Sequence, residues 1–356
     1  MKVIEQSRSQ VVPELSIIAV FKAFPNTNID VMLDSIRKLA IKHEVILITE
    51  NIEKGAAVKQ YLTKLLDFNS NLLSSKMVLM DLETDKGPAL IRNVGAVLAD
   101  SASLLFIDDD AAIWDDITPL LEYLKNNICQ GVQPLIVRLS NTETVDSAGD
   151  FVKKGRSGLY SAYSKGYGKS LKSIRNDLHI EEVPSMRSAF MMVRKDAFMA
   201  VDGFDSTFNF NFEDVDLGWR MVIAGYRLLF VPSIRALHKG GRTANKQTLN
   251  EKIVRLSMLN MHAMLLKASK YLYWPYILTK FQVTLLKYEF LRIKKQKVDL
   301  GCAARDFIAM NQLFIERLKQ VVLHRQILSK EFHFKGRKKL DDMAKGKRFI
   351  YLEPQK

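Results

Sequence analysis

The stretch Leu104-Leu105-Phe106-Ile107-Asp108-Asp109-Asp110-Ala111 decides how the rest of this chain is interpreted. Its four apolar residues are typical of a strand buried on both faces, as in a parallel sheet covered by helices. Such a sheet binds its ligands beyond the carboxyl ends of its strands. The three aspartates stand at that end, where they would either hold a divalent cation or form a polar turn that caps a helix.

Short apolar runs alternate with longer amphipathic ones through the first 130 residues, which is typical of βαβ units. Strands are expected at residues 15–21, 45–48, 77–80 and 104–107. Helices are expected at residues 29–40, 54–67, 87–99 and 116–127. The pattern predicts an α/β fold with a doubly wound sheet.

The turn after the first strand disfavours two common uses of such a sheet. Residues 21–25, Phe-Lys-Ala-Phe-Pro, contain no glycine, so the G-x-G-x-x-G turn of dinucleotide-binding proteins is missing. A G-x-x-x-x-G-K-[ST] loop is also missing from the sequence. The pattern therefore argues against NAD-dependent enzymes and P-loop NTPases.

A second group of acids follows four phenylalanines in residues 204–212. Glu213, Asp214 and Asp216 fall in the first turn of an expected helix that Gly225 would end. Acids there stabilise the helix dipole by roughly 0.3–1 kcal/mol each, and one or two would be enough. Three acids beside an aromatic wall favour a general base, because apolar surroundings and a neighbouring carboxylate both raise a carboxyl pKa.

His238 follows another expected strand, at residues 226–232, and precedes a pair of glycines. A single histidine is more often structural than a metal ligand, but this one stands on a polar loop that can approach a site. Residues 153–172 are rich in Gly, Ser, Tyr and Lys. They are interpreted equally well as a mobile lid or as an ordinary surface insertion.

Four motifs, in this order, resemble the family-2 glycosyltransferases of the GT-A fold over roughly residues 14–242. Asp85–Gly95 resembles the N-x-G-x-x-x-x-R-N-x-G motif that opens a helix, and Phe106–Asp110 resembles the strand-ending D-x-D motif. Gly203–Asp205 with Phe212–Leu217 resembles the G-F-D…E-D-x-D-L pair, and Val231-Pro232 with His238 resembles the closing strand and metal histidine. The resemblance implies a GT-A type, doubly wound mixed α/β sheet with helices on both faces.

The resemblance also implies a divalent metal, Mn²⁺ or Mg²⁺, which would act as a Lewis acid on a diphosphate leaving group. Its main ligand would be Asp110, with His238 as a further ligand, while Asp108 would either bond the ribose or share the metal; hard cations prefer such carboxylate oxygens. Alternation along an extended chain points Asp109 away from its two neighbours, so it is expected to support them.

A nucleotide sugar would contact residues at the ends of several strands and one helix: Phe21, Glu50, Arg92, Asp108 and Asp109. Phe21 would stack on the base and Glu50 would accept a hydrogen bond from it. Both depart from the family, which usually has a P-x-Y-N-like end to the first strand and an aspartate after the second.

By the same resemblance, Asp214 is the base that deprotonates an acceptor hydroxyl as it attacks the anomeric carbon. Glu213 positions the acceptor, or is itself the base if the alignment shifts by one residue. A single displacement from the face opposite the diphosphate inverts the anomeric configuration. The implied enzyme moves a sugar from a UDP-, dTDP- or GDP-linked donor to a glycan or polyprenyl-linked acceptor in bacterial surface polysaccharide synthesis. A non-catalytic scaffold on this fold and a nucleotidyltransferase are the alternatives.

The net charge of +14 lies entirely in the last third of the chain. Residues 1–249 hold 30 Lys/Arg and 30 Asp/Glu, whereas residues 250–356 hold 23 and 9. This asymmetry predicts a catalytic domain at 1–249 and a mostly helical, basic region at 250–356 that meets an anionic partner. Basic runs at 292–297 and 335–339 belong to no recognisable nucleic-acid-binding module, so no nucleic acid is expected.

An apolar stripe beside lysines in the basic region predicts an interfacial membrane helix: Ile277, Phe281, Leu285 and Tyr288. The alternative is a helix packed on the catalytic domain with a solvated lysine face. Cys129 and Cys302 are too few for a disulfide framework or a zinc site, which fits a reducing compartment. Neither a secretory signal nor an apolar run of about 18 residues is visible. The sequence thus predicts a cytoplasmic protein, peripheral on the inner face of the cell membrane.

Overall fold

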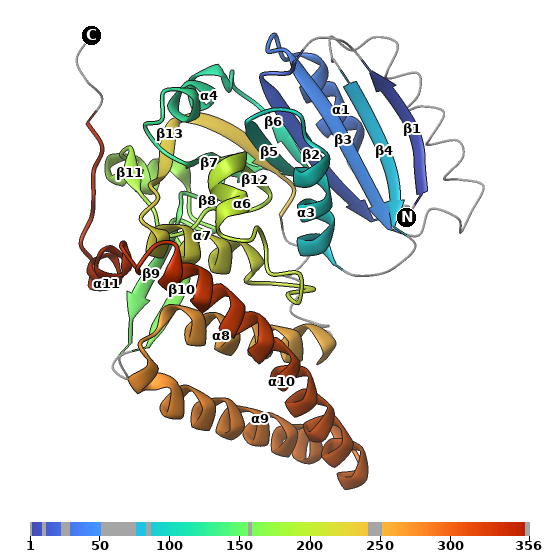
Figure 1. Ribbon diagram of the computed structural model, residues 1–356, viewed down its shortest axis with the longest axis vertical. Helices are drawn as coiled ribbons and strands as arrows, with labels where there is room; N and C mark the ends of the chain where they lie inside the picture. Colours follow the sequence, from blue (N-terminus) through green and yellow to red (C-terminus); the bar gives the residue numbers. More distant parts are fainter. Residues whose placement is uncertain are drawn as a thin grey trace.

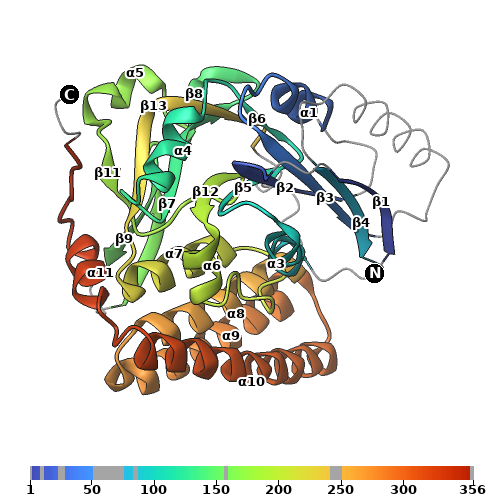
Figure 2. The same cartoon turned by 45° about the horizontal axis from the view of Figure 1, so that its top comes forward.

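A computed structural model describes residues 2–8, 12–22, 29–50, 76–82, 87–155, 159–240 and 251–352. Within these ranges an eleven-stranded mixed sheet lies at one end of the molecule and a group of long helices lies at the other (Figure 1, Figure 2). The described residues between 2 and 238 build the sheet with the helices that cover it, and residues 251–344 build the second group.

The parallel half of the sheet matches the strands expected from the sequence. Its strands lie side by side in the order β4 (Lys76–Leu82), β3 (His43–Glu50), β2 (Leu15–Lys22) and β5 (Ser103–Asp108). Each neighbouring pair is parallel, which confirms the βαβ interpretation, and β1 (Lys2–Arg8) pairs antiparallel with β4. The helix expected at residues 54–67 lies outside the described residues.

The other half of the sheet mixes strand directions. β12 (Phe190–Arg194) runs antiparallel to both β5 and β7 (Gly131–Arg138), whereas β13 (Leu228–His238) is parallel to β7. β13 is longer than expected because an irregularity between Val231 and Arg235 accommodates Pro232, after which pairing resumes as far as His238. Three short strands join this half: β6 (Ala111–Ile113), β8 (Asn141–Ser147) and β11 (Glu181–Glu182).

Helices cover both faces of the sheet, as the resemblance implies. Successive residues of a strand point to opposite faces, so β5 contributes Leu105 to one core and Phe106 to the other. The core with Leu105 includes the buried faces of α1 (Ile29–Arg37) and α4 (Thr118–Lys125). The core with Phe106 includes those of α3 (Pro88–Leu98), α6 (Lys195–Ala200) and α7 (Glu213–Ala224).

A separate hairpin lies in the segment expected to be either a lid or an insertion. It consists of β9 (Asp150–Lys154) and β10 (Tyr160–Ser164), and the short helix α5 (Leu171–Ile174) follows. The hydroxyl of Tyr160 donates to Oδ1 of Asp341 at 2.7 Å, and its ring packs edge-on against Trp219. These contacts favour an ordinary insertion for the described residues of the segment.

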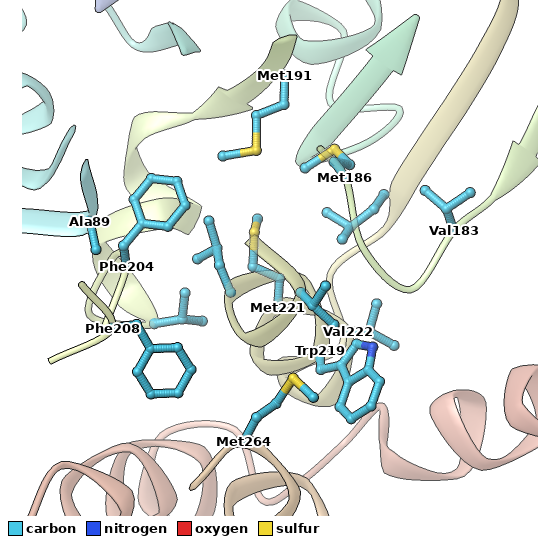
Figure 3. Close-up of a cluster of buried hydrophobic side chains, with 14 of the residues drawn as sticks. Ala89, Val183, Met186, Met191, Phe204, Phe208, Trp219, Met221, Val222 and Met264 are labelled. Carbon is cyan, nitrogen blue, oxygen red and sulfur yellow. The ribbon is translucent and has the colours of Figure 1, made fainter. Parts of the chain in front are cut away.

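Within residues 251–352 the chain is mostly helical, as its pattern predicts. The helices are α8 (Glu251–Ala268), α9 (Trp274–Gln296), α10 (Leu300–Lys330) and α11 (Arg337–Ala344). α8 packs directly below α7, where Met264 lies close to Trp219 and Phe208 (Figure 3). The domain boundary at 249/250 stays a prediction, since residues 241–250 lie outside the described part of the chain.

The apolar stripe expected to face a membrane lies in the core instead. Ile277, Phe281 and Leu285 are fully buried, and the Phe281 ring stacks on Phe314 of α10 with their centroids 4.1 Å apart. Tyr288 is half-buried against the same core. The interpretation of this stripe as a membrane face is therefore wrong, because the stripe packs against neighbouring helices.

Candidate active site

Three candidate metal ligands converge where β5 and β13 end. Nε2 of His238 lies 3.2 Å from Oδ1 of Asp110, and one ligand atom each from Asp108, Asp110 and His238 lies within 4.8 Å of the others. β6 follows Asp110 directly and pairs with β13 so that Ala111 lies opposite His238. This pairing brings the histidine to the aspartates. Asp109 is buried and does not belong to the group.

Arg92 links the two acidic motifs. Its side chain is buried, with Nη2 2.6 Å from Oδ1 of Asp108 and Nη1 3.2 Å from Oε1 of Glu213. Burial alone would lower the pKa of Arg92, but these carboxylates outweigh it and raise the pKa, so the guanidinium stays charged. α3 reaches this position because Gly95 packs on β2, where a Cβ would stand 2.4 Å from Cγ2 of Ile18.

The G-F-D motif contacts two elements that carry residues of the site, α3 and β5. The amide of Asn93, next to Arg92, bonds the backbone N–H and C=O of Phe204 at 2.9 and 2.8 Å. The Phe204 ring packs edge-on against Phe106 of β5, with centroids 5.3 Å apart. The motif therefore ties α3 and β5 together beneath the acids.

Asp214 lies in the first turn of α7, immediately after a strained turn. Asn211 and Phe212 have φ angles of 63° and 68°, a left-handed conformation that costs non-glycine residues about 1–3 kcal/mol each. Nδ2 of Asn260, on α8, donates to the carbonyls of Phe210 and Asn211 at 2.7 and 2.8 Å. α8 therefore holds the turn that presents the candidate base. α7 ends at Gly225, as expected, with φ 96°.

The surroundings of Asp214 bring its carboxyl group close to neutral titration. Burial, with the neighbouring carboxylates of Glu213 and Asp150, raises the pKa of Asp214 to about 7. The Arg187 cation and the Ser188 N–H, 3.3 Å from Oδ2, act in the opposite direction. A carboxylate with this pKa can accept a proton near pH 7.

Three charged residues that sequence reasoning missed surround the site: Asp146, Asp150 and Arg187. Oδ2 of Asp146 lies 2.9 Å from Nδ1 of His238, and Arg187 contacts Asp150 at 3.3 Å and Asp146 at 3.8 Å. Asp146 is on β8, and only the pairing of β8 with β7 brings it to β13. These residues stand outside the four motifs, and no local pattern marks them.

The donor set fits a hard divalent cation, with two carboxylates and one imidazole that a third carboxylate orients. Burial alone would lower the pKa of His238, but Asp110 and Asp146 outweigh it and raise the pKa to about 10. The imidazolium thus neutralises these carboxylates, as a cation would. Metal binding would displace its proton.

A second acidic group, Asp205, Asp216 and His324, is fully buried. Nζ of Lys267 lies 2.9 Å from Asp216 and also contacts Asp205, and Nε of Arg220 lies 2.8 Å from Asp216. An ammonium group already neutralises these acids, so the group is an ion-pair network between α7 and α8 rather than a metal site.

Two predicted nucleotide-binding side chains, Phe21 and Glu50, lie outside the described part of the chain. Their strands are described, and β2 pairs Val20 with Asp108 and Lys22 with Glu50. The ends of β2 and β3 are thus adjacent to the end of β5. The nucleotide-binding roles of Phe21, Glu50, Arg92, Asp108 and Asp109 stay predictions.

The architecture that carries this site is the GT-A fold of glycosyltransferases. The chain aligns with the crystal structure of GalNAc-T7 with UDP, GalNAc and Mn²⁺ at a TM-score of 0.53. The alignment covers 72% of this chain and 48% of that chain at 17% sequence identity, so the likeness is one of fold.

Curated relatives of the sequence are glycosyltransferases. The pre-mycofactocin glycosyltransferase of Mycobacterium tuberculosis is 28% identical over 153 residues, which is 43% of this chain and 30% of that protein. The rhamnosyltransferase WbbL of Escherichia coli K12 is 44% identical over 50 residues, 14% of this chain and 19% of that protein. The chain thus spans less than a third of these relatives. No protein-family model matches it.

Proposed function

We propose that this chain is an inverting glycosyltransferase that moves a sugar from a nucleotide-sugar donor to a hydroxyl group of a glycan or lipid-linked acceptor. One observation carries the proposal: buried Arg92 joins Asp108, on the donor side, to Glu213, beside the candidate base. The diphosphate leaving group and the attacking hydroxyl group can therefore be held on two sides of the Arg92 guanidinium cation. The glycosyltransferase relatives and the shared fold support this class of activity.

Asp108, Asp110 and His238 would hold Mn²⁺ or Mg²⁺ on the donor side. The bound cation would neutralise the charge that develops on the diphosphate leaving group. GalNAc-T7 was solved with UDP, GalNAc and Mn²⁺, which supports a nucleotide-sugar donor, and the donor we propose is UDP-, dTDP- or GDP-linked. Asp146 would keep the His238 imidazole oriented through Nδ1.

Asp214 would take the proton of the acceptor hydroxyl as that oxygen attacks the anomeric carbon. Its pKa of about 7 suits this role, because about half of the carboxyl groups are then ionised at neutral pH. Glu213 is held by Arg92, so it is better placed to position the acceptor than to exchange protons. Attack from the side opposite the diphosphate inverts the anomeric configuration.

The acceptor we propose is a growing bacterial surface polysaccharide or its polyprenyl-linked precursor. The E. coli rhamnosyltransferase among the relatives supports a bacterial glycan acceptor. Among the described residues, no helix is long and apolar enough to cross a membrane.

Donor hydrolysis separates this function from its alternatives. The protein is incubated with UDP-, dTDP- and GDP-sugars, with Mn²⁺ or with a chelator, and the released nucleotide is measured. A transferase hydrolyses one class of donor slowly and only with metal, and the Asp110→Ala variant does not. A scaffold would bind a donor without turnover, and a nucleotidyltransferase would instead make pyrophosphate from a nucleoside triphosphate and a sugar phosphate. Either of these two results would refute the proposal.

A further inference from the structure

α9 is apolar on two opposite sides, only one of which is buried. Ile277, Phe281 and Leu285 form the buried side. The other side carries large apolar residues at helical spacing that are between 45% and 60% exposed: Tyr276, Val283, Leu286 and Phe290. We call these four residues the outer face of α9. Large apolar side chains gathered on one exposed side of a helix are typical of an interaction surface.

Lysines flank the outer face without acidic partners. Lys280, Lys287 and Lys294 lie along one edge of this face by helical spacing, and none of the three forms an ion pair within the described part of the chain. The only acidic residue of α9, Glu289, is buried and bound to Arg292. The surface around the outer face is therefore positively charged as well as apolar.

α9 lies at the end of the molecule that is farthest from the sheet, with α8 between them (Figure 1). It has 23 residues and is therefore about 35 Å long. A straight helix in this position can lie flat on a surface without bringing the catalytic sheet into collision with it.

We propose that the outer face of α9 docks on an anionic lipid surface. Apolar side chains bordered by unpaired lysines match the interface of such a membrane, where the apolar side chains enter the headgroup layer and the lysines meet lipid phosphates. A second copy of the chain fits less well, because a twofold contact would place these lysines against one another. Vesicle binding does not depend on the proposed function; only its purpose, to reach a lipid-linked acceptor, rests on that function.

Flotation with vesicles tests the apolar part of the surface. Vesicles of phosphatidylcholine with phosphatidylglycerol should carry the full chain upward, and vesicles of phosphatidylcholine alone should not. Val283→Glu should weaken binding about tenfold, because it places a negative charge against the lipid phosphates. Val97→Glu is the matched control, since Val97 is exposed to a similar extent but belongs to α3 of the catalytic domain.

A charge series tests the electrostatic part. Replacing Lys280, Lys287 and Lys294 together by glutamine should weaken binding about a hundredfold, since each lysine near an anionic surface contributes about 1 kcal/mol, which is about a factor of five. The control replaces three exposed lysines of the catalytic domain, Lys38, Lys42 and Lys172, and changes the net charge equally. Circular dichroism checks that each variant is folded.

Three outcomes would overturn the proposal. They are equal binding to both kinds of vesicle, equal loss in the α9 variants and their controls, and a dimer in sedimentation that Val283→Glu dissociates. Donor hydrolysis by the same variants is measured in parallel without vesicles. Intact hydrolysis with lost flotation in the α9 variants supports the docking surface, whereas a wild-type chain that floats with the vesicles but hydrolyses no donor would refute the proposed function alone.

Discussion

The candidate active site at the ends of β5 and β13 differs from the outer face of α9 in how its charged side chains are paired. At the site, the buried guanidinium of Arg92 pairs with the carboxylates of Asp108 and Glu213. On α9, lysines stand at the surface with no acidic partner among the described residues. Buried charges must be paired because desolvation is costly, so their partners fix a geometry. Unpaired surface charges fix no geometry within the chain and remain available to a partner.

The largest expected effect is the loss of the proposed base, Asp214. Asp214→Asn keeps the shape of the side chain but cannot accept a proton, so kcat for sugar transfer should fall by about 10²- to 10⁴-fold. Asp196→Asn is the matched control, since Asp196 also lies in the first turn of a helix, α6, but is remote from the acids of the site. An unchanged kcat would move the base to Glu213, which Glu213→Gln would then test.

The second-largest expected effect distinguishes the role of Asp110 from that of its neighbour Asp109. Asp110→Ala removes a member of the converging group and should weaken Mn²⁺ binding by about 10- to 100-fold or more, as measured by electron paramagnetic resonance. Asp109 lies outside that group, so Asp109→Ala should weaken Mn²⁺ binding much less. Equal losses in both variants would show that the division of roles between the aspartates is wrong.

The pH dependence of kcat/KM reports on the network around Asp214. A general base works in its deprotonated form, so if Asp214 is the base, as proposed, the rate should fall about tenfold per pH unit below its pKa of about 7. Arg187→Met removes a positive charge that lowers this pKa, and the inflection should therefore move to higher pH. If the inflection of Arg187→Met stays at the wild-type pH, the Arg187 charge does not lower the pKa of Asp214.

The smallest expected effect tests whether α8, in the helical region, helps to position the residues of the site. Asn260→Ala removes the two hydrogen bonds that hold the turn before Asp214, and kcat should fall by about tenfold while donor KM stays unchanged. Asn311→Ala removes an amide of α10 that bonds Gln282 and the Phe307 carbonyl instead, and should leave kcat unchanged. Equal effects would point to a general loss of packing.

Much of the site could be predicted because its motifs are local. The four apolar residues before Asp108 predict a buried strand, and the helical spacing after Glu213 predicts the helix that presents Asp214. Asp146, Asp150, Arg187 and Asn260 could not be found in this way. Their neighbours in the sequence carry no signal, and they reach the site only through strand pairing or helix packing.

The sequence by itself determined the order of strands and helices, the acids at their ends and the basic last third. Those features depend on residues close together in the chain. Tertiary structure alone decided which side of α9 is buried, since both sides are apolar and periodicity cannot choose between them. Packing of Phe281 on Phe314 makes that choice and leaves Val283 and Phe290 exposed. Tertiary structure also brings His238 to Asp110, because that contact requires β6 to pair with β13.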